Sequence, residues 1–335
     1  MNFRSQEDIF DAFSNLKVLI IGDVMVDTYT HGKVDRISPE APVPVLHVTG
    51  REERLGGAAN VALNVSALGA KPYLCSAIGN DVEGDMLLRL MAQSNLPDDG
   101  ILRSDSRITT TKQRVMSGAH HLLRVDTEDI GQLNIEVRKN LLERIESLLP
   151  ECSVVIFEDY DKGVLGKELI ESVIEMATKA GIPTVVDPKK RNFMFYRGAS
   201  LFKPNLKELR EGLKIDFDPD KPGELDSAVQ QLKDALQLNG ALITLSERGM
   251  YIDFNETRYH IPAWLRNIAD VSGAGDTVIS IAALCVALGL PPKLVLALSN
   301  LGGGLVCEYA GVVPIDKANL LAEAKRHGLY EKYAR

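Results

Sequence analysis

The sequence of 335 residues predicts an α/β protein in which a mostly parallel sheet carries helices on both faces. Short, continuously apolar segments typical of buried strands alternate with longer segments of helical spacing. We found no internal repeat and no linker that divides the chain, and 45% of its residues are hydrophobic, which suffices for one large core. We therefore expect a single domain over residues 1–335.

The predicted strands are short and rich in branched apolar residues, and they cover 18–21, 72–77, 154–157, 184–186, 201–202 and 241–245. Helical spacing marks residues 58–68, 82–94, 135–149, 165–180 and 228–238. Gly69 stands where a helix C-cap is expected. This alternation is typical of a doubly wound sheet, which binds ligands at the carboxyl ends of its strands.

Two segments do not fit the alternation and predict a small β flap, or lid, outside the main sheet. Residues 31–50 and 107–126 are rich in β-branched and alternating residues. Pro39, Pro42 and Pro44 exclude the first segment from a helix or a central strand. We expect the flap to be antiparallel.

Charge and cysteine content narrow the class of protein. A formal net charge of −8 argues against non-specific nucleic-acid binding and favours small-molecule chemistry. The cysteines are scattered without a CxxC pair, which predicts reduced thiols and neither a disulfide framework nor a cysteine metal site: Cys75, Cys152, Cys285 and Cys307. Residues 1–13 carry no apolar signal core, and the longest apolar run, 278–290, is too short to cross a bilayer. We expect a cytoplasmic protein without membrane or nucleic-acid partners.

Residues 270–276 read Asp-Val-Ser-Gly-Ala-Gly-Asp and lead into the apolar stretch 278–284, so a glycine turn opens a helix with a carboxylate in its first turn. Unpaired N–H groups at a helix N-terminus attract phosphate oxygens, and glycines let the backbone approach them closely. Asp276 could then accept a proton from an attacking hydroxyl. The alternative is an ordinary turn whose Asp complements the helix dipole, and these seven residues alone favour neither.

Further polar residues follow predicted strands. Asp27 can accept hydrogen bonds from two neighbouring hydroxyls, and Asn60 offers a donor and an acceptor to a polyol. The alternative for Gly56-Gly57 is a tight turn, with Asn60 on a helix surface. Asn205 and Glu208 have the spacing of a capping box, and the same side chains suit the neighbourhood of Mg²⁺ and its waters. For Asn205 and Glu208, helix capping and organisation of Mg²⁺ carry equal weight and are compatible.

In this order the motifs resemble the PfkB, or ribokinase-like, family of carbohydrate kinases. Gly56-Gly57-x-x-Asn60 is similar to its amino-terminal signature and residues 270–276 to its carboxyl-terminal one. The resemblance covers nearly the whole chain and implies a three-layer αβα sandwich with a small β lid, with ATP as phosphoryl donor.

Within this family the chain is most similar to kinases that phosphorylate D-glycero-β-D-manno-heptose 7-phosphate at O1, a step toward ADP-heptose for lipopolysaccharide. The similarity lies in runs at 20–27, 36–45, 159–163, 186–189 and 196–199, of which Ser-Pro-Glu-Ala-Pro-Val-Pro is especially specific. The family motifs alone leave the sugar open.

The resemblance implies a role for each motif residue. Asp276 resembles the catalytic base, and the backbone of Gly273, Ala274 and Gly275 resembles the anion hole for the transferred phosphoryl group. The residues that correspond to the family's sugar contacts are Asp27, Gly56, Gly57 and Asn60. The nucleotide side matches Asn205, Thr244, Ser246, Gly249 and, more loosely, Asn300. Glu208 corresponds to a Mg²⁺ position through water, and Asp270 with the backbone near Ser272 to part of a monovalent-cation site for K⁺.

The phosphate already on such a substrate needs cations of its own. We expect them among Lys112, Arg114 and Arg124 on the flap and Lys189 after a sheet strand; the alternative for each is a solvated surface charge. The chain departs from the family pattern at three places. Ser272 replaces the more usual Thr, and Ser246 replaces the more usual Gly. Lys190-Arg191 occupies a position where the family more often has Gly.

The resemblance also implies partners. In this family such flaps often cover the sugar, and we expect a homodimer that associates through them. No His-x-Gly-His run occurs, so we expect no nucleotidyltransferase domain in these residues and a separate nucleotidyltransferase as the pathway partner. The alternatives are a related kinase for another sugar or sugar phosphate and a non-catalytic sugar or nucleotide sensor. The sensor is disfavoured because it has no need of a base.

Overall fold

A computed structural model describes residues 3–118, 120–264 and 266–334. Within them the main sheet contains these strands: β1 (Lys17–Gly22), β4 (Lys71–Gly79), β5 (Ile101–Ser104), β8 (Val154–Glu158), β9 (Thr184–Asp187), β10 (Leu201–Phe202), β11 (Gly240–Thr244), β12 (Met250–Phe254) and β13 (Thr257–Ile261). Their spatial order is β13-β12-β11-β10-β9-β8-β1-β4-β5. The hairpin of β12 and β13 is antiparallel to the rest, and the other neighbours are parallel.

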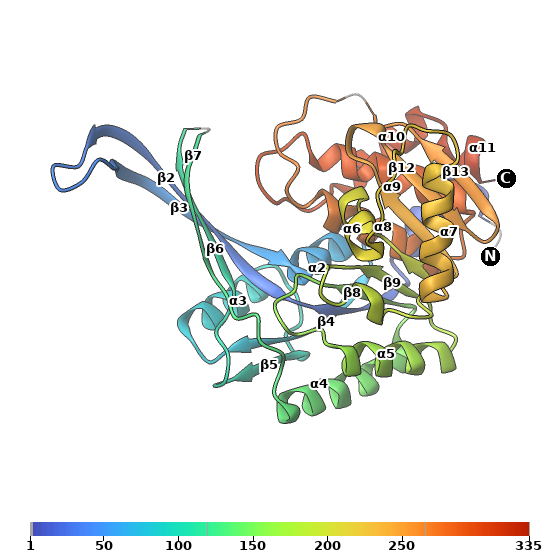
Figure 1. Ribbon diagram of the computed structural model, residues 1–335, viewed down its shortest axis with the longest axis horizontal. Coiled ribbons are helices and arrows are strands. Elements are labelled where there is room, and N and C mark those ends of the chain that lie inside the picture. The colour runs from blue at the N-terminus through green and yellow to red at the C-terminus, as the bar shows by residue number, and fades with distance from the viewer. Residues whose placement is uncertain (1–2, 119, 265, 335) are drawn as a thin grey trace.

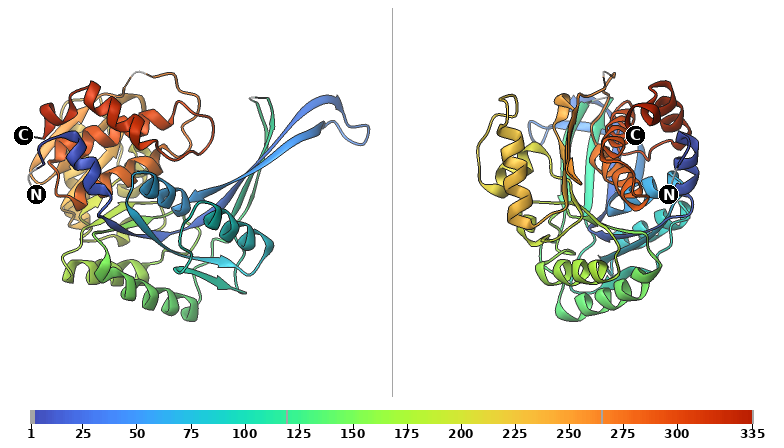
Figure 2. Two further views of the ribbon diagram at one scale, coloured as in Figure 1. Left: turned by 180° about the vertical axis from the view of Figure 1, so that it is seen from behind. Right: turned by 90° about the vertical axis from the view of Figure 1, so that its right-hand side faces the viewer.

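Helices cover both faces of this sheet (Figure 2). Successive residues of a strand point to opposite faces, so Val18 and Ile20 of β1 join one core while Leu19 and Ile21 join the other. The first core is closed by α1 (Gln6–Phe13), α2 (Ala58–Ala67), α3 (Val82–Gln93), α8 (Ala274–Ala287), α9 (Pro292–Val306), α10 (Lys317–Arg326) and α11 (Leu329–Tyr333). The second is closed by α4 (Ile135–Leu148), α5 (Lys167–Lys179), α6 (Leu206–Leu213) and α7 (Glu224–Leu236). The predicted three-layer α/β sandwich is confirmed.

Helix α8 lies largely enclosed within the fold. Its residues from Asp276 to Cys285 are all buried, and it packs against α2 and α9. A Cβ atom on Gly302 of α9 would lie 2.1 Å from the Cδ1 atom of Ile281, so the glycine permits the close approach of the two helices. Across the described residues, no helix combines the length and apolar character needed to cross a membrane.

A second sheet projects from the body as the flap (Figure 1). It consists of β2 (Val24–Ile37), β3 (Pro44–Gly57), β6 (Thr111–Ser117) and β7 (His120–Thr127), in the order β3-β2-β6-β7. The strands extend beyond the predicted flap segments, since β2 starts at Val24 and β3 reaches Gly57. Residues 107–110 precede β6 and are not strand.

The prediction of an antiparallel flap is wrong for one pair. The β2–β3 and β6–β7 pairs are antiparallel, but β2 and β6 run parallel. The reason lies in the connection: the chain passes through the body between β3 and β6 and returns to the base of the flap, so β6 leaves the body in the same direction as β2 (Figure 1).

A single carboxylate fastens the base of the flap to the main sheet. Asp23 stands between β1 and β2 and is 1% exposed. It accepts hydrogen bonds from the backbone N–H groups of Tyr160, Lys162 and Val164 at 2.9, 3.1 and 2.9 Å. The residue that follows β1 therefore holds the loop that follows β8.

We predict that Asp23→Ala lowers the free energy of unfolding by about 3 kcal/mol, because each buried N–H group left without an acceptor costs about 1–3 kcal/mol. Urea denaturation measures the loss. The control is Asp35→Ala on the exposed part of β2, which should change the stability by less than about 0.5 kcal/mol. Equal stabilities of the two variants would contradict the prediction.

Candidate active site

Polar residues gather at the carboxyl ends of neighbouring strands. Glu158 ends β8 and pairs in register with Asp187, which ends β9. Lys203 directly follows β10, and Thr244 ends β11. These strand ends face the start of α8, as expected for a doubly wound sheet.

The start of α8 presents the predicted carboxylate in its first turn. Gly273 is the N-cap residue with φ of 81°, and the helix begins at Ala274. Asp276 is 4% exposed. Its Oδ2 atom accepts a hydrogen bond from Asn60 Nδ2 at 2.6 Å, and its Oδ1 atom accepts one from Tyr160 Oη at 2.8 Å.

Burial raises the pKa of Asp276 to about 6, while the two donors act in the opposite direction. Asp276 is therefore mostly a carboxylate at neutral pH, with a pKa close to the working range of a general base.

The glycines keep this helix start free of side-chain bulk. A Cβ atom on Gly273 would lie 3.2 Å from Asn60 Nδ2. One on Gly275 would lie 3.6 Å from Asp187 Oδ2 and 3.7 Å from Lys203 Nζ. Since the first N–H groups of a helix have no partner within it, this surface suits an anion.

Two lysines and two carboxylates form a group of ion pairs beside the start of α8. Lys203 Nζ is 2.7 Å from Asp187 Oδ2. Lys189 Nζ is 3.4 Å from Asp187 Oδ1 and 3.0 Å from Glu208 Oε1. Both lysines remain charged, because the neighbouring carboxylates raise the pKa of each ammonium group despite its burial.

Glu158, Tyr160 and Lys203 are among the site residues that the sequence prediction missed. Glu158 is 0% exposed, and neither of its carboxyl oxygens has a hydrogen-bond partner among the described residues. Burial and the nearby Asp187 and Asp276 raise its pKa well above the ordinary value, which favours the protonated form. All three residues stand at or just after predicted strand ends, which was the signal available in the sequence.

The predicted sugar residues lie at the base of the flap. Asp27 of β2 is 3% exposed and forms an ion pair with Arg114 of β6. A Cβ atom on Gly56 would lie 2.2 Å from Asp27 Oδ2, so the glycine makes room for this carboxylate. Gly57 has φ of 60° and leads the chain into α2. Asn60 is 0% exposed, so the helix-surface alternative for it is wrong.

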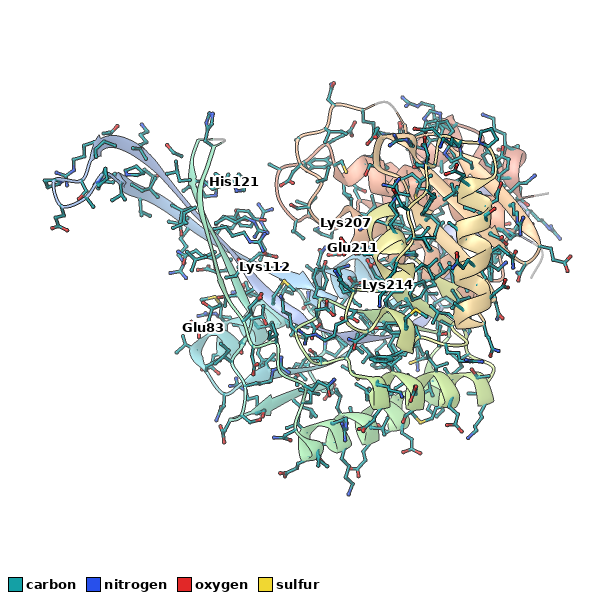
Figure 3. The ribbon with its side chains drawn as sticks, viewed as in Figure 1. Glu83, Lys112, His121, Lys207, Glu211 and Lys214 are labelled. Atoms are coloured by element: carbon teal, nitrogen blue, oxygen red, sulfur yellow. The ribbon has the colours of Figure 1, made fainter. Side chains whose placement is uncertain are left out.

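The four predicted phosphate ligands separate into distinct environments. Lys112 lies at the base of the flap (Figure 3), with its Nζ atom 5.2 Å from the ring centre of Tyr160. Among the described residues Lys112 has no ion-pair partner within 4.0 Å. Arg124 pairs with Asp126 and is largely exposed. Arg114 is engaged by Asp27, and Lys189 belongs to the charge group at the sheet edge.

The basic pair at 190–191 lies away from that group. Lys190 Nζ is 3.5 Å from Glu211 Oε2, and its side chain is 73% exposed. Arg191 Nη1 donates to the backbone oxygen of Ile130 at 2.6 Å. The solvated-surface interpretation therefore applies to Lys190.

The predicted nucleotide residues lie along the ends of β10 and β11. Asn205 caps α6, and it forms a complete capping box with Glu208. A backbone bridge also joins Asn205 to Thr244. Ser246 has φ of 54° and Gly249 has φ of 89°, which explains why Gly is the familiar residue at both positions. Asn205 and Ser246 line a hollow together with Lys207 and Glu211 of α6, both labelled in Figure 3.

The remaining predicted ligands are already held by the protein. Asn300 is 6% exposed and donates to the backbone oxygen of Pro262 at 2.9 Å. Asp270 Oδ1 accepts from the backbone N–H and the hydroxyl of Ser272, and its Oδ2 atom accepts from Gly311 N at 2.9 Å. These bonds leave Asp270 ionised beside the backbone of residues 307–311, an arrangement that fits a monovalent cation.

No group of three or more metal-ligating side chains occurs in the part of the chain that the structure describes. Mg²⁺ keeps several waters and binds phosphate oxygens with only one or two carboxylates. Glu208, with Asp187 nearby, fits this mode of binding.

Comparison with known proteins places these observations in a family. Residues 15–318 match the model of the pfkB family of carbohydrate kinases. The bifunctional protein HldE of Methylobacillus flagellatus is 40% identical over 307 residues, which are 91% of this chain and 62% of that protein. The HldE protein of Caulobacter vibrioides is 42% identical over 313 residues, 93% of this chain and 64% of that protein. The chain thus spans less than two thirds of the length of these relatives.

Solved structures share the fold. Phosphofructokinase-2 from Escherichia coli in complex with substrates and products has a TM-score of 0.78 at 18% identity, covering 96% of this chain and 100% of that one. Ribokinase from Arabidopsis thaliana complexed with ribose and ATP has a TM-score of 0.71 at 14% identity, with coverage of 91% and 98%. The family match over residues 15–318 establishes that the chain belongs to the pfkB family and is an ATP-dependent carbohydrate kinase.

Proposed function

We propose that this kinase transfers the γ-phosphoryl group of ATP to O1 of D-glycero-β-D-manno-heptose 7-phosphate, giving the 1,7-bisphosphate. The observation that carries the proposal is the position of Asp276. It lies in the first turn of α8, beside the glycines of the helix start, and it is bonded to Tyr160, whose ring lies near Lys112 at the base of the flap. The runs at 36–45 and 159–163 and the similarity to HldE proteins support heptose as the sugar.

In this reaction Asp276 accepts the proton of the attacking hydroxyl, because it is ionised at neutral pH. The backbone of Gly273, Ala274 and Gly275 faces the transferred phosphoryl group and stabilises its charge, with the N–H of Ala274 exchanging its 3.3 Å hydrogen bond to the Val271 oxygen for one to the phosphoryl group. Lys203 adds a positive charge next to this position. Mg²⁺ would supply charge neutralisation on the ATP phosphates, with Glu208 and Asp187 near its waters, and Asp270 with Ser272 would hold K⁺.

The same proposal places the protein in the cytoplasm, which its four unpaired cysteines favour. A nucleotidyltransferase that uses the sugar 1-phosphate is the partner reaction it implies. The alternative of another sugar or sugar phosphate is tested directly by comparing kcat/KM for heptose 7-phosphate, unphosphorylated heptose, fructose 6-phosphate and ribose in a coupled ATP assay. A higher value for any of the other three sugars would replace the heptose phosphate proposal.

We predict that Asp276→Asn lowers kcat by about 10²–10⁴-fold, since a positioned base contributes about this factor and the amide cannot accept the proton. Circular dichroism and ATP binding by calorimetry should match the parent protein. Turnover within a few-fold of the parent would rule out Asp276 as the base.

A second prediction concerns the phosphate of the substrate. Lys112→Met keeps the apolar stem and removes an ammonium group that has no carboxylate partner among the described residues. Loss of a charge-assisted contact should raise KM for the sugar phosphate by about ten- to a hundred-fold. KM for ATP should barely change. The control, Lys33→Met on the exposed part of β2, should leave both constants unchanged. Equal effects of the two variants would remove Lys112 from the phosphate site.

The flap predicts a homodimer. Its outer strand β7 has an unpaired edge, and Leu123 and Val125 on it are 57% and 42% exposed. We expect a dimer in sedimentation at micromolar concentration and a monomer for Leu123→Asp. The control is Ile135→Asp, which changes a 77% exposed residue on α4 and should stay dimeric. A monomeric parent protein would contradict association through the flap.

A further inference from the structure

Tyr160 lies directly against the proposed base. It follows β8 by two residues and donates its hydroxyl proton to Asp276 Oδ1 at 2.8 Å. Burial and the neighbouring Asp276 raise the pKa of Tyr160 well above its usual value, so the hydroxyl remains a donor across the working pH range. The resemblance to known kinases assigns this side chain no role.

The loop that carries Tyr160 is held on both sides of the residue by buried carboxylates. Asp23 accepts the backbone N–H of Tyr160. Asp159 is 0% exposed and accepts hydrogen bonds from Tyr196 Oη at 2.7 Å and Asn192 Nδ2 at 3.0 Å. Because neither anchor touches Asp276, the protein fixes Tyr160 independently of the base.

Two ammonium groups also lie near the ring of Tyr160. Lys112 Nζ from the flap and Lys189 Nζ from the sheet edge are each 5.2 Å from its centre. A cation near the face of an aromatic ring is attracted by the ring quadrupole. The two lysines therefore restrain the ring and keep its hydroxyl aimed at Asp276.

The surroundings of Asp276 show why the hydroxyl matters. Burial and the carboxylate of Asp187 oppose its ionisation. Asn60 from α2, Tyr160 from the loop and Lys203 after β10 favour it. Asn60 and Tyr160 bond to different oxygens, so together they fix the plane of the carboxylate. Each oxygen keeps a further lone pair for a substrate hydroxyl.

We propose that Tyr160 is a positioning residue for the kinase reaction, whose hydroxyl keeps Asp276 ionised and oriented toward the sugar hydroxyl. The catalytic consequence rests on the proposed function, whereas the effect on the ionisation of Asp276 does not.

The test is the titration of the Asp276 carboxyl carbon by ¹³C NMR in the ATP-free and sugar-free enzyme. The signal is assigned by its loss in Asp276→Asn. In the parent protein we expect a midpoint at about pH 6. In Tyr160→Phe it should rise by about one pH unit, because a hydrogen bond to the charged form is lost. The acid limb of kcat should move to higher pH by the same amount, since the base is protonated and inactive below its pKa.

Tyr251→Phe is the matched control, because it also removes the hydroxyl of a buried tyrosine that donates to a carboxylate, that of Asp226, without a bond to the loop that carries Tyr160. It should lower stability and leave the titration of Asp276 unchanged. Replacement of Tyr160 by 3,5-difluorotyrosine keeps the side chain and makes the hydroxyl a stronger donor. It should lower the midpoint, and it tests the proposal even if Tyr160→Phe folds poorly.

An unchanged midpoint in both Tyr160 variants, or an equal shift in Tyr251→Phe, overturns the inference and leaves the kinase proposal intact. Full turnover of Asp276→Asn overturns the proposed function instead, while the titration still reports on the Tyr160–Asp276 bond. A shifted midpoint with an unshifted acid limb of kcat refutes the positioning role in catalysis.

Discussion

The structure depends on the burial of a carboxylate, Asp276, at the start of a buried helix. A buried charge is costly unless donors and opposite charges surround it. The fold meets this requirement with residues from three separate segments: Asn60 on α2, Tyr160 after β8 and Lys203 after β10. Hydrogen-bond donors and ion pairs at the strand ends, together with the start of α8, therefore offset the cost of burying this charge.

The flap is connected to the residues around Asp276 by hydrogen bonds at its base. Only Asp23 separates strand β1 from strand β2, and its side chain accepts a hydrogen bond from the backbone of Tyr160. On the other side of the flap, Arg54 donates to the backbone oxygens of Ala310 and Val312 at 3.3 and 3.0 Å. A Cβ atom on Gly273 would lie 3.4 Å from the side chain of Val312, so this contact reaches the anion hole. Closure of the flap over a sugar would thus act on residues next to the phosphoryl group.

The sequence predicted those elements whose signals are local. The strands β1, β4, β8, β9, β10 and β11 and the helices α2, α3, α4, α5 and α7 were found because their apolar patterns are strong. Helix α9 was not predicted, since Gly302, Gly303 and Gly304 have a low intrinsic helix propensity. Its close packing on α8 compensates for that propensity. The hairpin of β12 and β13 turns at Asn255 and Glu256, both with positive φ, and lacks the glycine that marks most such turns.

The sequence by itself determined where α8 begins, that Asp276 lies in its first turn, and that Asn205 and Glu208 cap α6. Those features depend on residues only a few positions apart. Tertiary structure alone decided which groups hold Asp276 and how strongly it is ionised. Its donors are 216 and 116 residues away in the chain, and its pKa depends on burial by the whole core. Tertiary structure also decided which carboxylates pair with Lys189 and Arg114, because ion pairs form by proximity in space, which short-range spacing does not encode.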